Sequence, residues 1–206
     1  MVAGLWGKKI GMTQLFQKDK VVPVTVINTA NWYITQVKKE DKDGYNAVQV
    51  GFLRQKYSDK KFDENWLKNT KRYFSDVREI KLAATKEDLV AGKPADFSSV
   101  LAEGNSVDVF GHTKGCGFAG TVKRHGFKGG ANSHGDKTGR RPGSMSFMRS
   151  QGRVIKGKRL PGHMGTNRIA AKNLEIIKID SASNIIAVKG SVPGKTGSLL
   201  FISKRG

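Results

Sequence analysis

One stretch, residues 111–170, constrains the fold most, because it is rich in both glycine and basic side chains. It contains 13 Lys and Arg residues against a single acid, Asp136. The flanking regions are closer to neutral: residues 1–110 contain 18 basic and 14 acidic side chains, and residues 171–206 contain six and two. A segment with a single sign of charge is typical of a chain that contacts a polyanion.

The run from His125 to Arg153 has too little apolar surface to order itself. Its apolar side chains are two Phe, two Met and one Ala, and seven glycines interrupt it. Fixing its backbone costs roughly 30 to 55 kcal/mol, at about 1–2 kcal/mol per residue. Full burial of the four large apolar side chains returns only about 1.5–3 kcal/mol each. We therefore expect an extended arm that a partner orders.

The composition of the whole chain favours nucleic acid as this partner. With 206 residues the chain is long enough for one core with insertions, and its net charge of +20 suits a polyanion. A membrane protein would need an apolar run of about 18 residues or a basic amphipathic helix, and we find neither. The single cysteine, Cys116, excludes an internal disulfide. We expect a soluble protein of a reducing compartment with no removed signal.

Short segments of alternating or β-branched composition lie on both sides of the arm. We predict that they form strands; they are residues 21–28, 32–38, 45–52, 106–110, 174–180, 185–189 and 199–203. Asp43-Gly44 is a turn signal that joins the second and third of them into a hairpin. Between residues 53 and 104 we expect a short helix near 63–70, a strand near 77–82 and a turn of helix over 86–90, capped by Thr85.

This order of elements predicts a mainly β protein. Strands separated in sequence by the arm would close a small antiparallel β-barrel, with an inserted α/β subdomain and the long extended arm as additions. We expect residues 1–53, 106–124 and 166–206 to form the barrel. Residues 54–105 would form the inserted subdomain, and residues 125–165 the arm.

Two glycine motifs resemble nucleotide-binding loops, but neither has the context that such loops need. Residues 115–120 (GCGFAG) follow a strand in the G-x-G-x-x-G pattern, yet glycines interrupt the helix that should follow, and Asp136 is the only acid near the expected position. A use in close approach of backbone to phosphate is more plausible. Gly194-Lys195-Thr196 fails as a P-loop because residue 189 is Lys; it predicts a turn between the last two strands.

The histidines and the cysteine do not form a metal or catalytic motif. His112, Cys116, His125 and His134 lack the paired spacing of zinc ligands. Asp136 is the only acid near them, so a catalytic triad is equally unsupported. We expect no catalytic residue, no metal, no cofactor and no small-molecule substrate.

The basic run is better explained by RNA than by a solvated protein face. A solvated face mixes charges of both signs on a periodic helix, whereas this run is single-signed, aperiodic and interrupted by glycine. Arg clamps phosphates bidentately and Lys acts as a point charge. Phe127, Phe147 and the histidines can stack on unpaired bases, which irregular RNA offers and duplex DNA does not. The alternatives are a free architectural RNA-binding protein and a nucleotide-dependent enzyme.

Five segments carry a family resemblance along nearly the whole chain. They are residues 4–16 (GLWGKKIGMTQLF), 113–124 (TKGCGFAGTVKR), 141–144 (RPGS), 154–165 (VIKGKRLPGHMG) and 188–194 (VKGSVPG). In this order they resemble the family of the universal large-subunit ribosomal protein number three, in its bacterial form. Residues 54–105 match the family only loosely.

The resemblance implies a structural constituent of the large ribosomal subunit that binds rRNA and assists early assembly. It implies a translation-factor-like barrel, an arm directed toward the peptidyl-transferase region, and the large-subunit proteins fourteen and nineteen as neighbours. It implies a place in a cytoplasmic ribosome, although an organellar one would show the same sequence signals. The expected RNA-binding residues are Lys8, Lys9, Lys114, Lys123, Arg124, His125, Lys128, His134, Lys137, Arg140, Arg141, Arg149, Arg153, Lys156, Lys158, Arg159, His163 and Arg168.

Two positions depart from the family pattern. Cys116 stands where the family usually has Lys or Arg, which removes one expected phosphate contact. Arg149 stands where many bacterial members have a glutamine that can be methylated. We expect that modification to be absent here, and we expect the arginine to add a phosphate or base-stacking contact instead.

Overall fold

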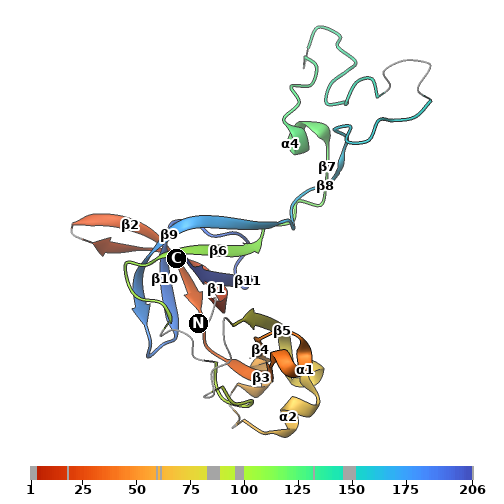
Figure 1. Cartoon of the computed structure of the whole chain (residues 1–206). Coiled ribbons are helices and arrows are strands. Elements are labelled where there is room, and N and C mark those ends of the chain that lie inside the picture. The colour runs from red at the N-terminus through yellow and green to blue at the C-terminus, as the bar shows by residue number, and fades with distance from the viewer. Residues whose placement is uncertain are drawn as a thin grey trace. The chain divides into compact units, whose positions relative to one another are not determined.

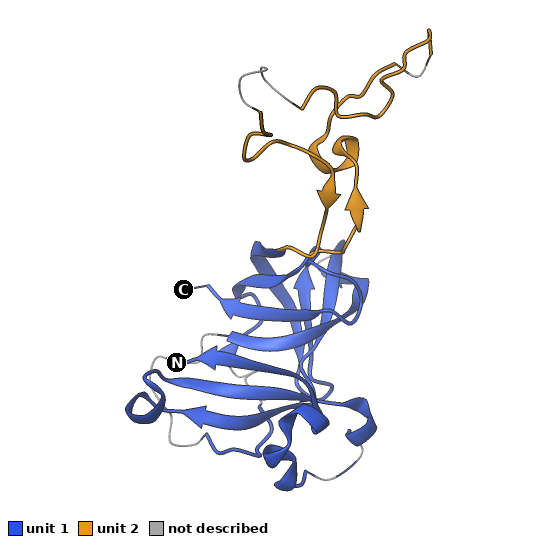
Figure 2. Cartoon of the chain, turned by 90° about the vertical axis from the view of Figure 1, so that its right-hand side faces the viewer, with its two compact units in different colours: residues 1–112, 168–206 blue, residues 113–167 orange. Residues whose placement is uncertain are grey.

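The computed structural model divides the chain into two compact units (Figure 2). Unit 1 contains residues 1–112 and 168–206, and unit 2 contains residues 113–167. The residues that the structure describes are 4–17, 19–58, 60, 62–82, 89–95, 100–131, 133–145 and 152–205.

Unit 1 is built on a closed antiparallel barrel, as the sequence predicts (Figure 1). Its strands in the described part of the chain are β1 (Gly4–Gln17), β2 (Lys20–Asn28), β6 (Ser106–His112), β9 (Arg168–Asp180), β10 (Ile185–Lys189) and β11 (Leu199–Lys204). They pair in the order β1-β11-β6-β9-β10-β2, and β2 pairs with β1 again. The mainly β class is therefore confirmed.

Alternation of side chains along the strands explains why the barrel forms. On β6, Val107 and Val109 are fully buried, and on β11, Leu200 and Ile202 are fully buried, while the residues between them face outward. Each such side chain contributes about 1.5–3 kcal/mol when it leaves water. These four side chains join one apolar cluster, and the barrel closes around it because period-two alternation puts every second residue on the same face.

A second sheet packs on this cluster. It contains β3 (Trp32–Lys38), β4 (Ala47–Leu53) and β5 (Phe74–Lys81) in that order. Trp32, Val48 and Ile80 from the three strands belong to the same apolar cluster as the barrel residues. Short helices accompany the sheet: α1 (Glu40–Asp43), η1 (Gln55–Tyr57), α2 (Asn65–Lys68) and α3 (Thr70–Tyr73). Around Trp66 of α2, a smaller cluster of aromatic side chains covers the end of the sheet.

The expected boundary of the barrel at residue 53 does not agree with the strand pairing. Residues 32–53 contain β3 and β4; β3 pairs with β4 and β4 pairs with β5, so neither pairs with a barrel strand. The hairpin itself is present, with α1 in its loop. Alternation in sequence identifies a strand, but it does not identify the partner, and both edges of β4 are taken within this second sheet.

Most of the predicted elements are confirmed. The strands expected at 21–28, 106–110, 174–180, 185–189 and 199–203 are present, and β9 begins earlier, at Arg168. The helix expected near 63–70 is two short helices, α2 and α3. The Pro-Gly loop does lie between the last two strands, β10 and β11. Most of the turn predicted over 85–90 lies outside the described residues.

Candidate nucleic-acid interface

Unit 2 begins with two antiparallel chain segments that hold the base of the arm. β7 (Phe118–Ala119) pairs with β8 (Gly162–His163), with Phe118 opposite His163. Three backbone hydrogen bonds extend this pairing: Thr113 N donates to Asn167 O at 2.9 Å, Cys116 N to Met164 O at 2.8 Å, and Met164 N to Gly117 O at 2.9 Å. The outgoing and returning chains are thus joined before the arm begins.

The short helix α4 (Thr121–His125) continues this base. It ends at Gly126, whose positive φ of 72° favours glycine, and Gly126 N donates to Val122 O. Arg124 Nη1 donates to Leu160 O at 2.7 Å, and His125 Nε2 lies 3.1 Å from the same oxygen. Two of the expected RNA-binding residues therefore also tie the outgoing chain to the returning one.

Beyond α4 the arm has local turns but little burial. Gly130 N donates to Gly139 O at 2.7 Å, and Arg141 N donates to Thr138 O at 3.0 Å. Asp136 accepts a hydrogen bond from Thr138 N at 2.8 Å, and bonds from Thr138 lower the pKa of its carboxyl. The carboxylate of Asp136, the single acid of the arm, thus stabilises a local backbone turn.

The basic side chains of unit 2 are all exposed wherever the structure describes them. They are Lys114, Lys123, Arg124, Lys128, Lys137, Arg140, Arg141, Arg153, Lys156, Lys158 and Arg159. The two predicted histidines His134 and His163 are exposed as well, and His125 is half-buried. Within the described part of this unit no ion pair is formed. Arg149 lies outside the described residues.

The remaining predicted residues lie in unit 1, and Lys8 and Lys9 have protein partners there. Lys8 Nζ lies 3.3 Å from Asp76 Oδ2 and 3.6 Å from the centre of the Phe52 ring. Lys9 Nζ donates to Val192 O at 3.0 Å and to Gly194 O at 3.1 Å. These contacts stabilise the fold of unit 1. That Lys8 and Lys9 bind RNA therefore stays a prediction with less support than the same prediction for unit 2.

Arg168 opens β9 and lies in a second basic and aromatic region that the sequence did not indicate. Its guanidinium carbon is 5.4 Å from the centre of the Phe110 ring. Phe110, Phe201 and Trp6 line a pocket here. They come from three strands that are far apart in sequence, so no local pattern brings them together.

The structure gives no support to the nucleotide-loop or metal alternatives. The helix after the Gly115–Gly120 motif, α4, has only five residues, too short for a dinucleotide fold. In the described ranges there is no group of three or more His, Cys, Asp or Glu side chains that would hold a metal ion. Among the same residues, no helix is both long and apolar enough to cross a membrane.

Comparison with known proteins identifies relatives along the whole chain. A family model described as Ribosomal protein L3 matches residues 79–184. The Large ribosomal subunit protein uL3 of Alkaliphilus metalliredigens is 42% identical, over 97% of this chain and 95% of the relative. The proteins of the same name from Thermosipho africanus and Prochlorococcus marinus are 42% and 45% identical, over 97% and 98% of this chain and 98% and 93% of theirs.

Proposed function

Because the chain belongs to the ribosomal protein L3 family, we propose that it binds large-subunit rRNA directly, through the basic surface of unit 2. As a member of this family it is a structural constituent of the large ribosomal subunit and not an enzyme. Its place is accordingly the ribosome, in the cytoplasm for a protein of the bacterial type.

One observation carries the proposal: unit 2 exposes every basic side chain that the structure describes in it and opposes them with one acid. Among its described residues only Ala119 and Thr121 are buried, so these cations do not cover a core. Each exposed Lys or Arg can instead neutralise a phosphate and release a counterion. The conformation of the arm is then completed by RNA, which supplies the contacts that the arm lacks.

The finer parts of the proposal follow from the family. We propose that the arm extends toward the peptidyl-transferase region and that the chain binds early in subunit assembly. The large-subunit proteins fourteen and nineteen are its proposed neighbours. The charge of unit 2 supports contact with rRNA along the arm, since a segment inside folded RNA meets phosphates on many sides.

The proposal is tested by neutralising charges in pairs of matched variants. One variant changes Lys137, Arg140 and Arg141 to Gln; the control changes Lys56, Lys68 and Lys71, three exposed cations of unit 1, to Gln. Binding to transcribed large-subunit rRNA is measured as a function of salt concentration. We expect the arm variant to lower the salt slope by about two to three units, since each lost phosphate contact removes roughly 0.7–0.9. The control variant should change the salt slope by less than one unit.

Equal losses in the two variants would show that unit 2 is not the main interface. Absence of any rRNA binding by the unsubstituted chain would refute direct binding altogether. Sedimentation separates the ribosomal role from that of an architectural RNA-binding protein outside the ribosome. The protein should sediment stoichiometrically with the large subunit after a salt wash, whereas an architectural protein would be released.

A further inference from the structure

A row of three aromatic side chains crosses the outer face of the barrel. Trp6 of β1 is the register partner of Phe201 of β11, which is in turn the partner of Phe110 of β6. The ring centroids are 4.9 Å apart for Trp6 and Phe201 and 6.3 Å apart for Phe201 and Phe110. The strand residues next to them are buried in the barrel, so alternation turns these three rings outward.

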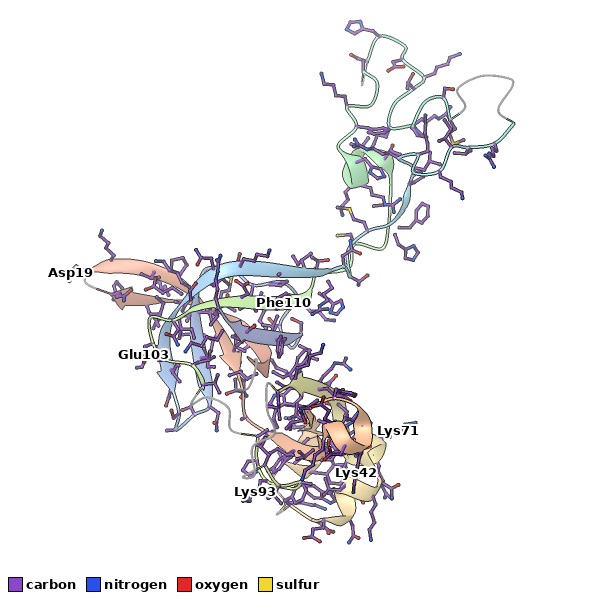
Figure 3. The ribbon with its side chains drawn as sticks, in the orientation of Figure 1. Asp19, Lys42, Lys71, Lys93, Glu103 and Phe110 are labelled. Carbon is purple, nitrogen blue, oxygen red and sulfur yellow. The ribbon has the colours of Figure 1, made fainter. Side chains whose placement is uncertain are left out.

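This row forms one wall of a pocket within unit 1. Asp76 and Arg78 of β5 line the pocket opposite the barrel strands, and His112 and Arg168 line it near the ends of β6 and β9. Its volume is about 160 Å³, which is below the roughly 300–1,000 Å³ of pockets for drug-sized ligands. Figure 3 labels Phe110, which lies on β6 at this face. The size suits one flat ring system rather than a larger ligand.

The rim of the pocket is cationic. Arg168 is exposed and lies over the Phe110 ring, and it is the register partner of His112 across β6 and β9. Arg78 is exposed on β5. The acid in the lining, Asp76, is offset by Lys8, whose ammonium lies 3.3 Å away. The site thus combines a wall of three mutually tilted aromatic rings with two arginines at its edge.

We propose that this pocket binds one unpaired nucleobase of RNA, packed against the Phe110 and Phe201 rings, with Arg78 and Arg168 contacting the adjacent phosphates. Aromatic side chains on a sheet surface, flanked by basic residues, are how proteins hold unstacked bases. This inference rests on the proposed function. It adds to the phosphate contacts of unit 2 a contact between unit 1 and a nucleobase.

The chemistry of the site favours a nucleobase over an apolar side chain of a protein partner. A protein side chain would gain little from two exposed arginines beside it, and these would have to lose water against an apolar surface. A nucleotide brings its own phosphates to the arginines and its flat ring to the aromatic wall. Arg guanidinium also stacks on bases as well as on Phe110.

The test uses the full chain and two short oligonucleotides that differ by one base. In the first, only the central position carries a base, adenine, and the other positions are abasic; in the second, all positions are abasic. Affinities are measured by fluorescence anisotropy for the unsubstituted chain, for Phe110→Leu and Phe201→Leu, and for the control Phe16→Leu. Phe16 is 76% exposed and does not line the pocket. Cooperative melting, followed by circular dichroism, establishes that each variant folds.

We expect the unsubstituted chain and Phe16→Leu to bind the oligonucleotide with one base about tenfold more tightly, within the range of one stacked base. Phe110→Leu and Phe201→Leu should bind the two oligonucleotides equally while keeping their affinity for the abasic one. No preference in the unsubstituted chain, or a preference that survives both pocket substitutions, would overturn the inference. Binding to the abasic oligonucleotide and to rRNA measures phosphate contacts independently of the preference for a base. Absence of that preference would therefore leave the proposed function of unit 2 intact.

Discussion

At the scale of single residues, the second sheet of unit 1 is stabilised by a charged pair whose effect depends on pH. Lys38 Nζ of β3 lies 2.7 Å from Glu79 Oε1 of β5, and the Tyr45 hydroxyl donates to Glu79 Oε2 at 2.9 Å. The hydrogen bond from Lys38 is the main cause that lowers the pKa of Glu79. The same bond raises the pKa of Lys38. The pair thus joins the two outer strands of the sheet across β4.

A lowered carboxyl pKa adds stability that is present above the unfolded-state pKa of about 4.3 and is lost as the pH falls through the folded-state value. We therefore expect Glu79→Gln to lower the melting temperature slightly at pH 7, by roughly 1–3 °C, because solvent screens the pair, whose side chains are 18% and 37% exposed. The difference from the unsubstituted chain should be smaller at pH 3 than at pH 7, because Glu79 becomes protonated as the pH falls. Thermal unfolding at both pH values measures it, with Glu64→Gln, an exposed carboxylate without an ion pair in the described residues, as control. A difference that persists undiminished at pH 3 would contradict this reasoning.

The sequence predicted the exposure of the basic side chains in the arm, but it did not predict the side-chain contacts within unit 1. A Lys or Arg among glycines has nothing apolar to pack on, so its exposure follows from the local sequence. Lys8 and Lys9 look the same in sequence, yet their ammonium groups meet Asp76 and the Val192 carbonyl, which strand pairing brings near. Phe110 and Phe201 were missed for the same reason, because only the register of β6 and β11 aligns them.

At the scale of elements, β1 shows where alternation fails as a signal. Residues 1–53 are predicted to belong to the barrel, but none of the predicted strands covers residues 4–17, where Gly4, Gly7 and Gly11 interrupt the apolar pattern. In the structure β1 pairs with β11 over Gly4–Lys8 and with β2 over Lys8–Gln17, with an irregularity between Lys9 and Gly11. Gly7 is required by packing: a Cβ there would lie 2.6 Å from the Ile27 side chain. Pairing with β11 and β2, rather than an alternating pattern in its own sequence, therefore determines that this segment is a strand.

The base of the arm is a second element whose geometry requires glycine. Gly165 has φ +88°, and a Cβ there would overlap the Lys114 carbonyl oxygen and approach the Cys116 nitrogen to 3.0 Å. We expect Gly165→Ala to weaken the pairing of the two chain segments by about 1–3 kcal/mol, the usual cost of such a conformation. The amides of Cys116 and Met164, which bond across the base, should then exchange hydrogen roughly 10 to 100 times faster.

Gly120→Ala is the matched control for this substitution. Gly120 has φ −68°, and a Cβ there would meet nothing within 4 Å, so the two amides should keep their exchange rates. The amides of Val107 and Val109 in the barrel should be unaffected by either change, since they belong to unit 1. Equal effects of Gly165→Ala and Gly120→Ala on the exchange rates would show that the conformation of Gly165 does not determine the stability of the paired segments at the base of the arm.

At the scale of the whole molecule, the two units differ in how much apolar packing stabilises each of them. The apolar clusters of unit 1 contain no residue from 113–167 in the described chain, whereas unit 2 buries only Ala119 and Thr121 among its described residues. The sequence predicted this contrast because the arm has few apolar side chains and one sign of charge. It did not predict that residues 32–53 leave the barrel for a second sheet, since that depends on pairing between distant segments.

This contrast predicts that the arm can be removed without unfolding the rest. In the variant, a short Gly-Ser linker replaces residues 126–158, so that Arg124 and His125 keep their bonds to Leu160. Cooperative melting of unit 1, followed by circular dichroism, should persist within a few degrees, because no described side chain of its core is lost. Affinity for large-subunit rRNA should fall by at least about tenfold at moderate salt, since eight Lys and Arg side chains that can contact phosphates are removed with the arm. Loss of the melting transition would instead make the arm part of the folding core, and unchanged rRNA affinity would place the interface on unit 1.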